Sequence, residues 1–136
     1  MKPDGSKIVQ AMEYVPQLNI IDTESKKVVA YHLDSDMSLS DLERVKDLKS
    51  YFTRVCADDD HIYAAFYGDI WNDNDINDVN KIYVFDWDGR LVSKVTANHS
   101  IDEIVVDNIN KILYTTSFAD EKLYCISTDK LTGEAR

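Results

Sequence analysis

Residues 81–94 read KIYVFDWDGRLVSK, and this stretch decides how the rest of the chain is interpreted. β-Branched and aromatic residues lie on both sides of an Asp-Trp-Asp-Gly sequence at 86–89. Glycine reaches positive φ without a Cβ clash, so an Asp-Gly pair between two such runs is typical of a β-hairpin. The stretch therefore predicts two antiparallel strands joined by a tight turn.

Weaker copies of this unit lie on both sides of it. In each copy a turn containing Asp precedes one strand, and a second strand ends at a polar residue. The copies are about 50 residues apart, close to the length of a four-stranded propeller blade once two insertions are allowed for. The chain is therefore predicted to be all-β, a partial β-propeller of about two and a half to three antiparallel blades with one short inserted helix. The matching segments are 4–5, 59–60 and 107–108 in the turns, and 19–22, 83–86 and 124–127 in the later strands.

Ten strands are expected from runs of β-branched and aromatic residues bounded by polar turns. Helical spacing appears once, where Ser40 and Glu43 form a capping box, and it predicts a helical insertion at 38–50. Residues 131–136 are expected to be frayed. The predicted strands are 8–15, 18–21, 27–33, 51–57, 61–67, 81–86, 91–97, 101–106, 112–118 and 123–127.

The Pro-Asp-Gly turn at 3–5, the Tyr-Val-Phe-Asp-Trp-Asp-Gly hairpin at 83–89 and the acidic insertions resemble one known family. They look like the TolB-like six-bladed propeller proteins of Bacteroides-type bacteria, in their C-terminal portion. The resemblance covers most of the chain and carries no catalytic residues over. It implies a partner segment that completes the ring, and it allows a periplasmic or cell-envelope location for full-length relatives.

Counting strands against four per blade divides the single domain, 1–136, into three parts. A blade at 8–33 lacks its first strand, a blade at 51–97 is complete, and a blade at 101–128 lacks its last strand. The alternative is a small ten-stranded sheet protein closed on itself. Strands such as 82–85 carry apolar residues on both sides, which fits sheets packed between sheets. Self-association, or capture of a complementary propeller half, is therefore expected.

The composition narrows the classes of partner. The 136 residues include 15 Lys and Arg against 25 Asp and Glu, a net charge of −10 that repels nucleic acids and anionic membranes. No apolar run is long enough for a membrane span, and residues 1–5 lack the apolar core of a signal peptide. Cys56 and Cys125 lie in predicted strands without metal or redox spacing, so buried free thiols are expected, with a mutual disulfide left open.

Successive connections of an antiparallel meander alternate between the two ends of its strands. By this count all the short turns share one face, and both long insertions share the other. Long loops on a rigid scaffold usually carry binding sites, so the insertion-bearing face is the candidate binding surface. The first face receives 3–7, 22–26, 57–60, 86–90 and 107–111, and the second receives 15–17, 34–50, 68–80, 98–100 and 119–122.

The acidic insertion after residue 67 supplies most of the candidate binding residues. Asp73, Asp75 and Asn77 have the alternate spacing of calcium ligands, but the turn Gly and terminal Glu of a calcium loop are missing. A weak calcium site is therefore possible here, and a solvated polar loop is the alternative. The candidate binding residues are Tyr67, Asp69, Trp71, Asp73, Asp75 and Asp78, with His99 from another loop of the same face.

The sequence contains no motif for a nucleophile with an adjacent base, and none for binding phosphate or a catalytic metal. Tyr63, Tyr83, Tyr114 and Tyr124 occupy strands of the repeats, where packing explains them better than ligand stacking. A non-catalytic propeller-type module that binds a protein, peptide or glycan is the preferred function, without a resident cofactor. The alternative is a fragment of a hydrolase- or lyase-like propeller enzyme whose site needs the missing blades.

Overall fold

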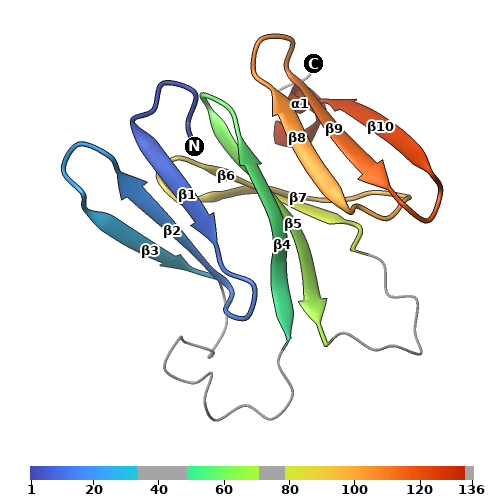
Figure 1. The fold of residues 1–136 in the computed structure, drawn as a ribbon, viewed down its shortest axis with the longest axis horizontal. Coiled ribbons are helices and arrows are strands. Elements are labelled where there is room, and N and C mark those ends of the chain that lie inside the picture. Colours follow the sequence, from blue (N-terminus) through green and yellow to red (C-terminus); the bar gives the residue numbers. More distant parts are fainter. Residues whose placement is uncertain (34–48, 71–78, 134–136) are drawn as a thin grey trace.

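The computed structural model describes residues 1–33, 49–70 and 79–133, and nearly all of the regular structure in these ranges is β-strand (Figure 1). The prediction of an all-β chain is confirmed. The elements are β1 (Lys7–Ala11), β2 (Gln17–Asp22), β3 (Val28–His32), β4 (Ser50–Ala57), β5 (His61–Asp69), β6 (Lys81–Asp86), β7 (Leu91–Thr96), β8 (Glu103–Asp107), β9 (Ile112–Ser117), β10 (Lys122–Ser127) and a short helix, α1 (Thr128–Thr132).

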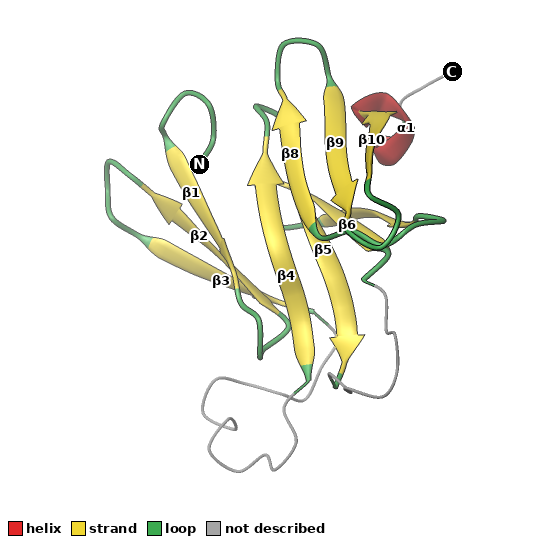
Figure 2. Ribbon diagram, turned by 45° about the vertical axis from the view of Figure 1, so that its right-hand side comes forward, coloured by secondary structure: helices red, strands yellow, loops and turns green. Residues whose placement is uncertain are grey.

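The strands form three antiparallel sheets of three, four and three strands. The first sheet has the order β1-β2-β3, the middle sheet β4-β5-β6-β7 and the third sheet β8-β9-β10, so each sheet is a simple meander. This is the arrangement expected of a partial β-propeller. Strand β4 lies beside both β1 and β8, and the sheets spread apart from this line (Figures 1 and 2).

Two hydrophobic cores hold the sheets together, one on each side of the middle sheet. Strand β6 contributes to both, because its side chains alternate between the two faces. Tyr83 and Phe85 pack toward the first sheet, whereas Ile82 and Val84 pack toward the third sheet, and all four are buried. The unbroken apolar run at 82–85 is thus explained by a strand covered on both faces.

The hairpin predicted at 81–94 is present, with a bulge where Val84 and Phe85 pair with β7. Gly89 has a φ of 84°, and a Cβ atom there would lie 2.3 Å from the ring of Tyr31 in the first sheet. Glycine is therefore required twice, for the turn conformation and for the close approach. The turn between β6 and β7 thus packs closely against Tyr31 of the first sheet.

Two expectations were wrong. Residue 131 does not begin a frayed end, since Leu131 belongs to α1 and is only 1% exposed. Its side chain packs in the core between the middle and third sheets, which orders this part of the chain. Both cysteines are free thiols, but Cys125 is exposed, because the outer face of the third sheet has no neighbour among the described residues.

Most of the predicted helical insertion at 38–50 lies outside the described residues, and its last residue, Ser50, begins β4. The predicted strand at 8–15 ends at Ala11 instead, because residues 12–16 form the connection to β2.

Candidate functional site

Backbone contacts sort the connections between strands into two faces, as strand alternation predicts. At one end Thr23 N donates to Ser6 O (3.0 Å), joining two turns of the first sheet. We call this end the turn face; it comprises the turns at 2–6, 22–27, 57–61, 86–90 and 107–112. At the other end Ile101 N donates to Val79 O (2.6 Å). We call this end the loop face; its described connections are 12–16, 97–102 and 117–121.

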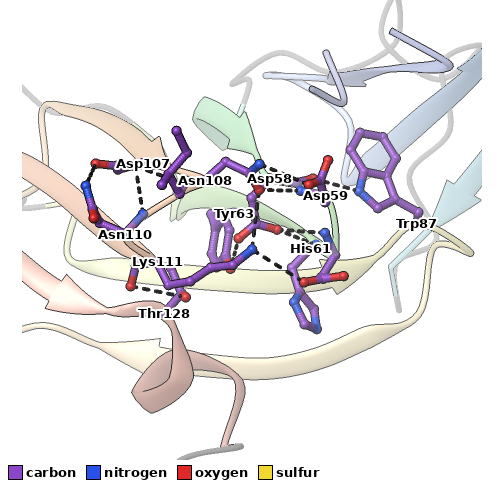
Figure 3. A network of polar contacts seen from close by, with 12 residues as sticks. Asp58, Asp59, His61, Tyr63, Trp87, Asp107, Asn108, Asn110, Lys111 and Thr128 are labelled. Carbon is purple, nitrogen blue, oxygen red and sulfur yellow. Dashed lines mark hydrogen bonds and ion pairs between the residues drawn. The ribbon is translucent and has the colours of Figure 1, made fainter. Parts of the chain in front are cut away.

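The turn face carries a polar network that joins the middle and third sheets (Figure 3). Asn108 accepts a hydrogen bond from the backbone N–H of Asp59 (3.0 Å) and donates its own Nδ2–H to the Asp59 carboxylate (3.0 Å). Lys111 Nζ lies 3.6 Å from an Asp60 carboxylate oxygen. These reciprocal contacts fix the turn between β4 and β5 against the turn between β8 and β9.

Asp58 is the buried centre of this network, with 1% of its surface exposed. One carboxylate oxygen accepts the backbone N–H groups of Asp60 (2.9 Å) and His61 (2.7 Å), and the other accepts the phenol of Tyr63 (2.9 Å). Trp87 Nε1–H donates to the Asp58 carbonyl oxygen (3.0 Å). These contacts hold the carboxylate and the carbonyl of Asp58 inside the fold, so the network stabilises the turn between β4 and β5.

Burial explains the ionisation of the neighbouring groups. Desolvation raises the pKa of the Tyr63 phenol, and its hydrogen bond to Asp58 raises that pKa further. Desolvation also raises the pKa of Cys56 to about 12, with a smaller contribution from the Asp58 charge. Cys56 is therefore a protonated, unreactive thiol at neutral pH.

On the loop face, His99 is the centre of a second polar cluster. Its Nε2 lies 3.0 Å from Thr115 Oγ1, and its ring is stacked on Tyr124 with centroids 3.7 Å apart and planes 7° apart. Tyr124 donates its phenol proton to the Asp120 carboxylate (3.0 Å). His99, Thr115, Asp120 and Tyr124 come from two connections and two strands, which the third sheet brings together.

Two serines extend this cluster. Ser117 Oγ lies 3.3 Å from Asp120 Oδ2 and 2.7 Å from Ser100 Oγ. Asp120 therefore accepts hydrogen bonds from both Ser117 and Tyr124. The connections at 97–102 and 117–121 are linked through these side chains.

The pKa values in the cluster follow from its partial burial. Desolvation lowers the pKa of His99, and the nearby Asp120 charge opposes that effect in part. The hydrogen bond to Asp120 raises the pKa of Tyr124, and desolvation adds to it. His99 is therefore neutral at pH 7, and a neutral imidazole both donates and accepts a hydrogen bond.

A cavity of about 580 Å³ lies next to this cluster, between the middle and third sheets. It extends from His99 on the loop face to α1 at the other end of the sheets. Its volume is in the range of pockets that hold small ligands. The lining residues are Ile82, Val95, Thr96, Ala97, Asn98, His99, Thr115, Tyr124, Cys125, Ile126, Ser127, Lys130 and Leu131.

The structure places three of the predicted site residues on the loop face. Tyr67 and Asp69 lie at the C-terminal end of β5, which is the end nearest this face. His99 lies in the connection between β7 and β8. The recorded contacts of His99 are with Asn98, Thr115 and Tyr124, and the recorded side-chain hydrogen bond of Asp69 is with Ile70. Trp71, Asp73, Asp75 and Asp78, with the calcium candidate Asn77, lie outside the described residues. Within the described ranges, no three acidic, His or Cys side chains gather closely enough to hold a metal ion.

Sequence reasoning missed the partners of His99. Tyr124 was assigned to packing alone, and Thr115 and Asp120 were not singled out; Lys130, at the other end of the cavity, was not singled out either. Strand alternation did contain a signal for Asp120, because it places the connections at 98–100 and 119–122 on the same face. No sequence pattern indicates that His99 stacks on Tyr124, since these residues come from connections and strands far apart in the chain.

Chemically, the cluster can position a ligand by hydrogen bonds, stacking and apolar contact. A hydroxyl within hydrogen-bond distance of an imidazole is also the nucleophile–base pair that covalent catalysis uses, before the third group that orients the base is considered. Thr115 is buried, however, and its hydroxyl already bonds to His99. Thr115 lines the cavity, so a molecule held there would meet a hydroxyl that is nearly covered and already paired with the imidazole.

The family model described as TolB-like 6-blade propeller-like matches residues 4–109. The chain belongs to this family. The match covers the first sheet, the middle sheet and β8, which places the turn-face aspartates inside it. In the TolB-like match His99 is included, whereas Thr115, Asp120 and Tyr124 follow its end.

A search of the curated proteins found no match. In the part of the chain that the structure describes, no helix has the length and apolar character needed to cross a membrane.

Proposed function

We propose that this protein is a non-catalytic, propeller-type binding module that holds its ligand at the loop face, in the cavity beside His99. The observation that carries the proposal is the position of this cavity. The cavity lies between the middle and third sheets, beside the cluster around His99. Side chains from the connections at 97–102 and 117–121 are linked in this cluster. Both connections belong to the loop face, which the alternation of strand direction indicates as the binding face. Binding sites commonly occur where rigid elements meet and loops converge.

The lining of the cavity supports a particular ligand chemistry. Ile82, Val95 and Ile126 provide apolar walls, and Lys130 in α1 is an exposed cation at the end of the cavity opposite His99. Among the described residues no Asp or Glu lines the cavity, although the whole chain has 25 of them. This favours a ligand with an apolar body and a neutral or negatively charged group, such as a peptide segment with a free carboxylate, over a basic ligand.

Glycans and folded protein partners belong to the same proposal, because the rim also carries hydroxyl and aromatic groups. Tyr67 and Asp69 are proposed to extend the binding surface across the loop face, together with Trp71, Asp73, Asp75 and Asp78 from the predicted acidic loop. The assignment to the C-terminal portion of a propeller from Bacteroides-type bacteria stays a prediction, because it rests on the turn and hairpin sequences alone.

Chemical-shift mapping tests the binding site directly. The ¹⁵N-labelled chain is titrated with a hexapeptide library bearing free C-terminal carboxylates, and separately with a panel of linear trisaccharides. We expect perturbations at the residues lining the cavity for the peptides. Lys130→Gln should weaken peptide binding by about tenfold, because a charge-assisted hydrogen bond is lost.

Lys122→Gln is the matched control, since it removes the same charge from the start of β10 without touching the cavity. Equal losses in the two variants would indicate non-specific electrostatic attraction and would contradict the site. Perturbations confined to the turn face would contradict it as well.

The possible calcium site is tested separately by calorimetric titration. Asp73, Asp75 and Asn77 would bind weakly, with a dissociation constant of about 0.1 to 1 mM, because the ligand set is incomplete. Absence of heat would leave the acidic loop as a solvated surface.

A second candidate function, a hydrolase- or lyase-like propeller enzyme, is favoured by the 3.0 Å contact between Thr115 Oγ1 and His99 Nε2. It is tested by hydrolysis of p-nitrophenyl acetate. Activity that disappears in Thr115→Val would support catalysis, whereas equal background rates in both proteins would exclude this pair as a nucleophile and base.

A further inference from the structure

A second pocket, of about 320 Å³, lies between the first sheet and the middle sheet. It shares no described lining residue with the cavity beside His99. The middle sheet separates the two, because Tyr83 lines the second pocket and packs toward the first sheet, whereas Ile82 lines the cavity and packs toward the third sheet. We call the second pocket the aromatic pocket.

Three aromatic rings, those of Tyr51, Phe66 and Tyr83, line the aromatic pocket. Phe66 is stacked on Tyr83, with ring centroids 4.1 Å apart and planes 14° apart. The ring of Tyr51 lies 6.2 Å from that of Phe66. Tyr83 is buried, whereas Phe66 and Tyr51 are only half-buried. The rings of Phe66 and Tyr51 therefore have surface left for a ligand to contact.

Two irregularities of the backbone place these rings. Tyr51 and Phe52 are consecutive in β4, and consecutive strand residues normally point to opposite faces. Both rings nevertheless lie near Phe66, at 6.2 and 5.5 Å, because the pairing of β4 with β5 shifts register on either side of Phe52. At Gly68, which has a φ of 78°, a Cβ atom would lie 2.7 Å from the Phe66 ring. β-Bulges commonly redirect side chains next to active sites.

Lys49 and Lys94 bring two positive charges to the aromatic pocket. Lys94 pairs with Tyr83 across β6 and β7, and its Nζ lies 5.1 Å from the centroid of the Tyr83 ring. Neither lysine forms an ion pair within the described ranges, and no described Asp or Glu lines the pocket. In a chain of net charge −10, the sign of the charge is thus reversed locally. A negatively charged ligand is therefore favoured.

The uncharged part of the lining narrows the class of anion. Apart from the two ammonium groups, the described side chains offer only the phenols of Tyr51 and Tyr83 for hydrogen bonding. A sugar acid would find few partners for its hydroxyls here, which weakens binding. An aromatic ring has no such groups and gains from contact with Phe66 and Tyr51. The volume lies near the lower end of the range for ligand pockets, which fits a single ring. The remaining described lining is apolar and consists of Pro16, Leu33 and Leu91.

We propose that the aromatic pocket is a second ligand site, which binds a monocyclic aromatic carboxylate such as phenylacetate. The ring lies against Phe66 and Tyr51, and the carboxylate accepts hydrogen bonds from the ammonium groups of Lys94 and Lys49. This site is independent of the one proposed beside His99, because the two are formed on opposite faces of the middle sheet. Either can be wrong without the other.

Titration of the ¹⁵N-labelled full chain with phenylacetate tests the proposal. We expect saturable shift changes at the amides of Tyr51, Phe66 and Lys94, and nuclear Overhauser effects from the phenyl protons to the Leu33 methyl groups. Changes confined to the residues around His99 would overturn the aromatic pocket as a site while supporting the cavity. Absence of any saturable change would also overturn it.

Three related probes test the chemical class of the ligand. Benzyl alcohol keeps the ring but lacks the charge, so it should bind about tenfold more weakly than phenylacetate. Cyclohexylacetate keeps the charge but lacks the aromatic ring, so it should bind at least about threefold more weakly. Glucuronate should cause no saturable change. Equal affinities for benzyl alcohol and phenylacetate would overturn the role of the lysines, and tighter binding of glucuronate than of phenylacetate would overturn the aromatic class.

Two variants test the residues. Lys94→Gln should weaken phenylacetate binding by about tenfold, because a charge-assisted hydrogen bond is lost. Lys122→Gln is the matched control, since it removes the same charge from the start of β10 and Lys122 lines neither pocket. Equal losses in these two variants would indicate general electrostatic attraction and would overturn the site. Tyr51→Leu, with its fold checked by its ¹⁵N–¹H spectrum, should weaken binding by at least about threefold. Unchanged binding by this folded variant would overturn the placement of the ligand ring.

Discussion

The turn face and the loop face are built from the same strands, yet they use their polar residues differently. On the turn face, the carboxylates of five aspartates accept backbone N–H groups of their own turns, and the contacts are internal. These residues are Asp4, Asp22, Asp58, Asp86 and Asp107. On the loop face, the polar groups around His99 line a cavity. An acidic surface is therefore not by itself a sign of binding, because at one end of this protein the acidic residues hold the turns together.

This comparison also bears on the net charge of −10. Part of the excess of acidic residues is needed for turn geometry, since Asp is one of the few side chains that bond to their own backbone two residues on. The remaining acidic residues include Asp69 and those of the predicted loop after it. Only the acidic residues that do not hold turns are therefore candidates for binding a ligand.

The largest expected effect comes from Trp87→Ala, which should destabilise the fold by about 3 to 5 kcal/mol. The substitution removes a buried ring from the core between the first and middle sheets, and it leaves the Asp58 carbonyl without its indole donor. Denaturation in guanidinium chloride measures the change. Trp87→Phe is the control that keeps most of the ring, and it should lose less than half as much stability. A loss below about 1 kcal/mol for Trp87→Ala would show that the turn face is not structural.

Asp58→Ala should destabilise the fold by about 2 to 3 kcal/mol, because two backbone N–H groups and the Tyr63 phenol lose their acceptor in a buried site. Asp58→Asn keeps one acceptor oxygen and should lose less. The comparison on the loop face is Asp120→Ala, where solvent can replace the carboxylate, so the loss should stay below about 1 kcal/mol. Equal losses for Asp58→Ala and Asp120→Ala would remove the distinction between the two faces.

Acid should destabilise the protein through the turn face. Hydrogen bonds, from Ser6 to Asp4, from Ser25 to Asp22 and from Asn110 to Asp107, hold the pKa of each carboxyl below its ordinary value of 3.8. Their contribution to stability is complete above pH 3.8 and is lost as the pH falls through the lowered values. Thermal melts between neutral pH and pH 2 measure this. The triple variant with Asn at these positions should show a flatter decline in melting temperature.

The smallest effect concerns His99. Its pKa is lowered mainly by desolvation, so its imidazole protons should titrate below 6.5 in an NMR experiment. The folded state therefore loses stability as the pH falls from 6.5 through that value. Asp120→Asn should lower the pKa of His99 further, because the opposing charge is removed. An unchanged pKa would mean that the Asp120 charge does not act on the imidazole.

Much of the fold could be predicted from the sequence because its signals are local. The Asp-Gly turn at 88–89 and the alternation around it fix the hairpin of β6 and β7, and the apolar run at 82–85 indicates a strand covered on both sides. Helix α1 was missed because five residues are too few to show helical period, and its N-cap residue Ser127 makes no side-chain hydrogen bond. Its order depends on Leu131 reaching a core formed by distant strands.

The candidate site could be predicted only as a face. Successive strands of a meander reverse direction, so every second connection lies at the same end of the sheet. Counting the strands therefore places the connections around His99 and Asp120 at one end. The stacking of His99 on Tyr124 and its contact with Thr115 depend on how β7 passes into β8 and how β10 folds back on β9. Such contacts between residues 16 or more positions apart leave no pattern in the sequence.

Burial of β6 on both faces has a consequence for the exchange of backbone hydrogens with solvent. Its amides are bonded to β5 on one side and β7 on the other, and both faces of the strand are covered by apolar side chains. They can exchange only when the two cores open together, so their exchange rate reports the free energy of global unfolding. Within the described ranges, strands β3 and β10 each pair with one neighbour, so their amides exchange through local opening. The ratio of the exchange rates in β6 and β10 therefore separates global unfolding from local opening without any mutation.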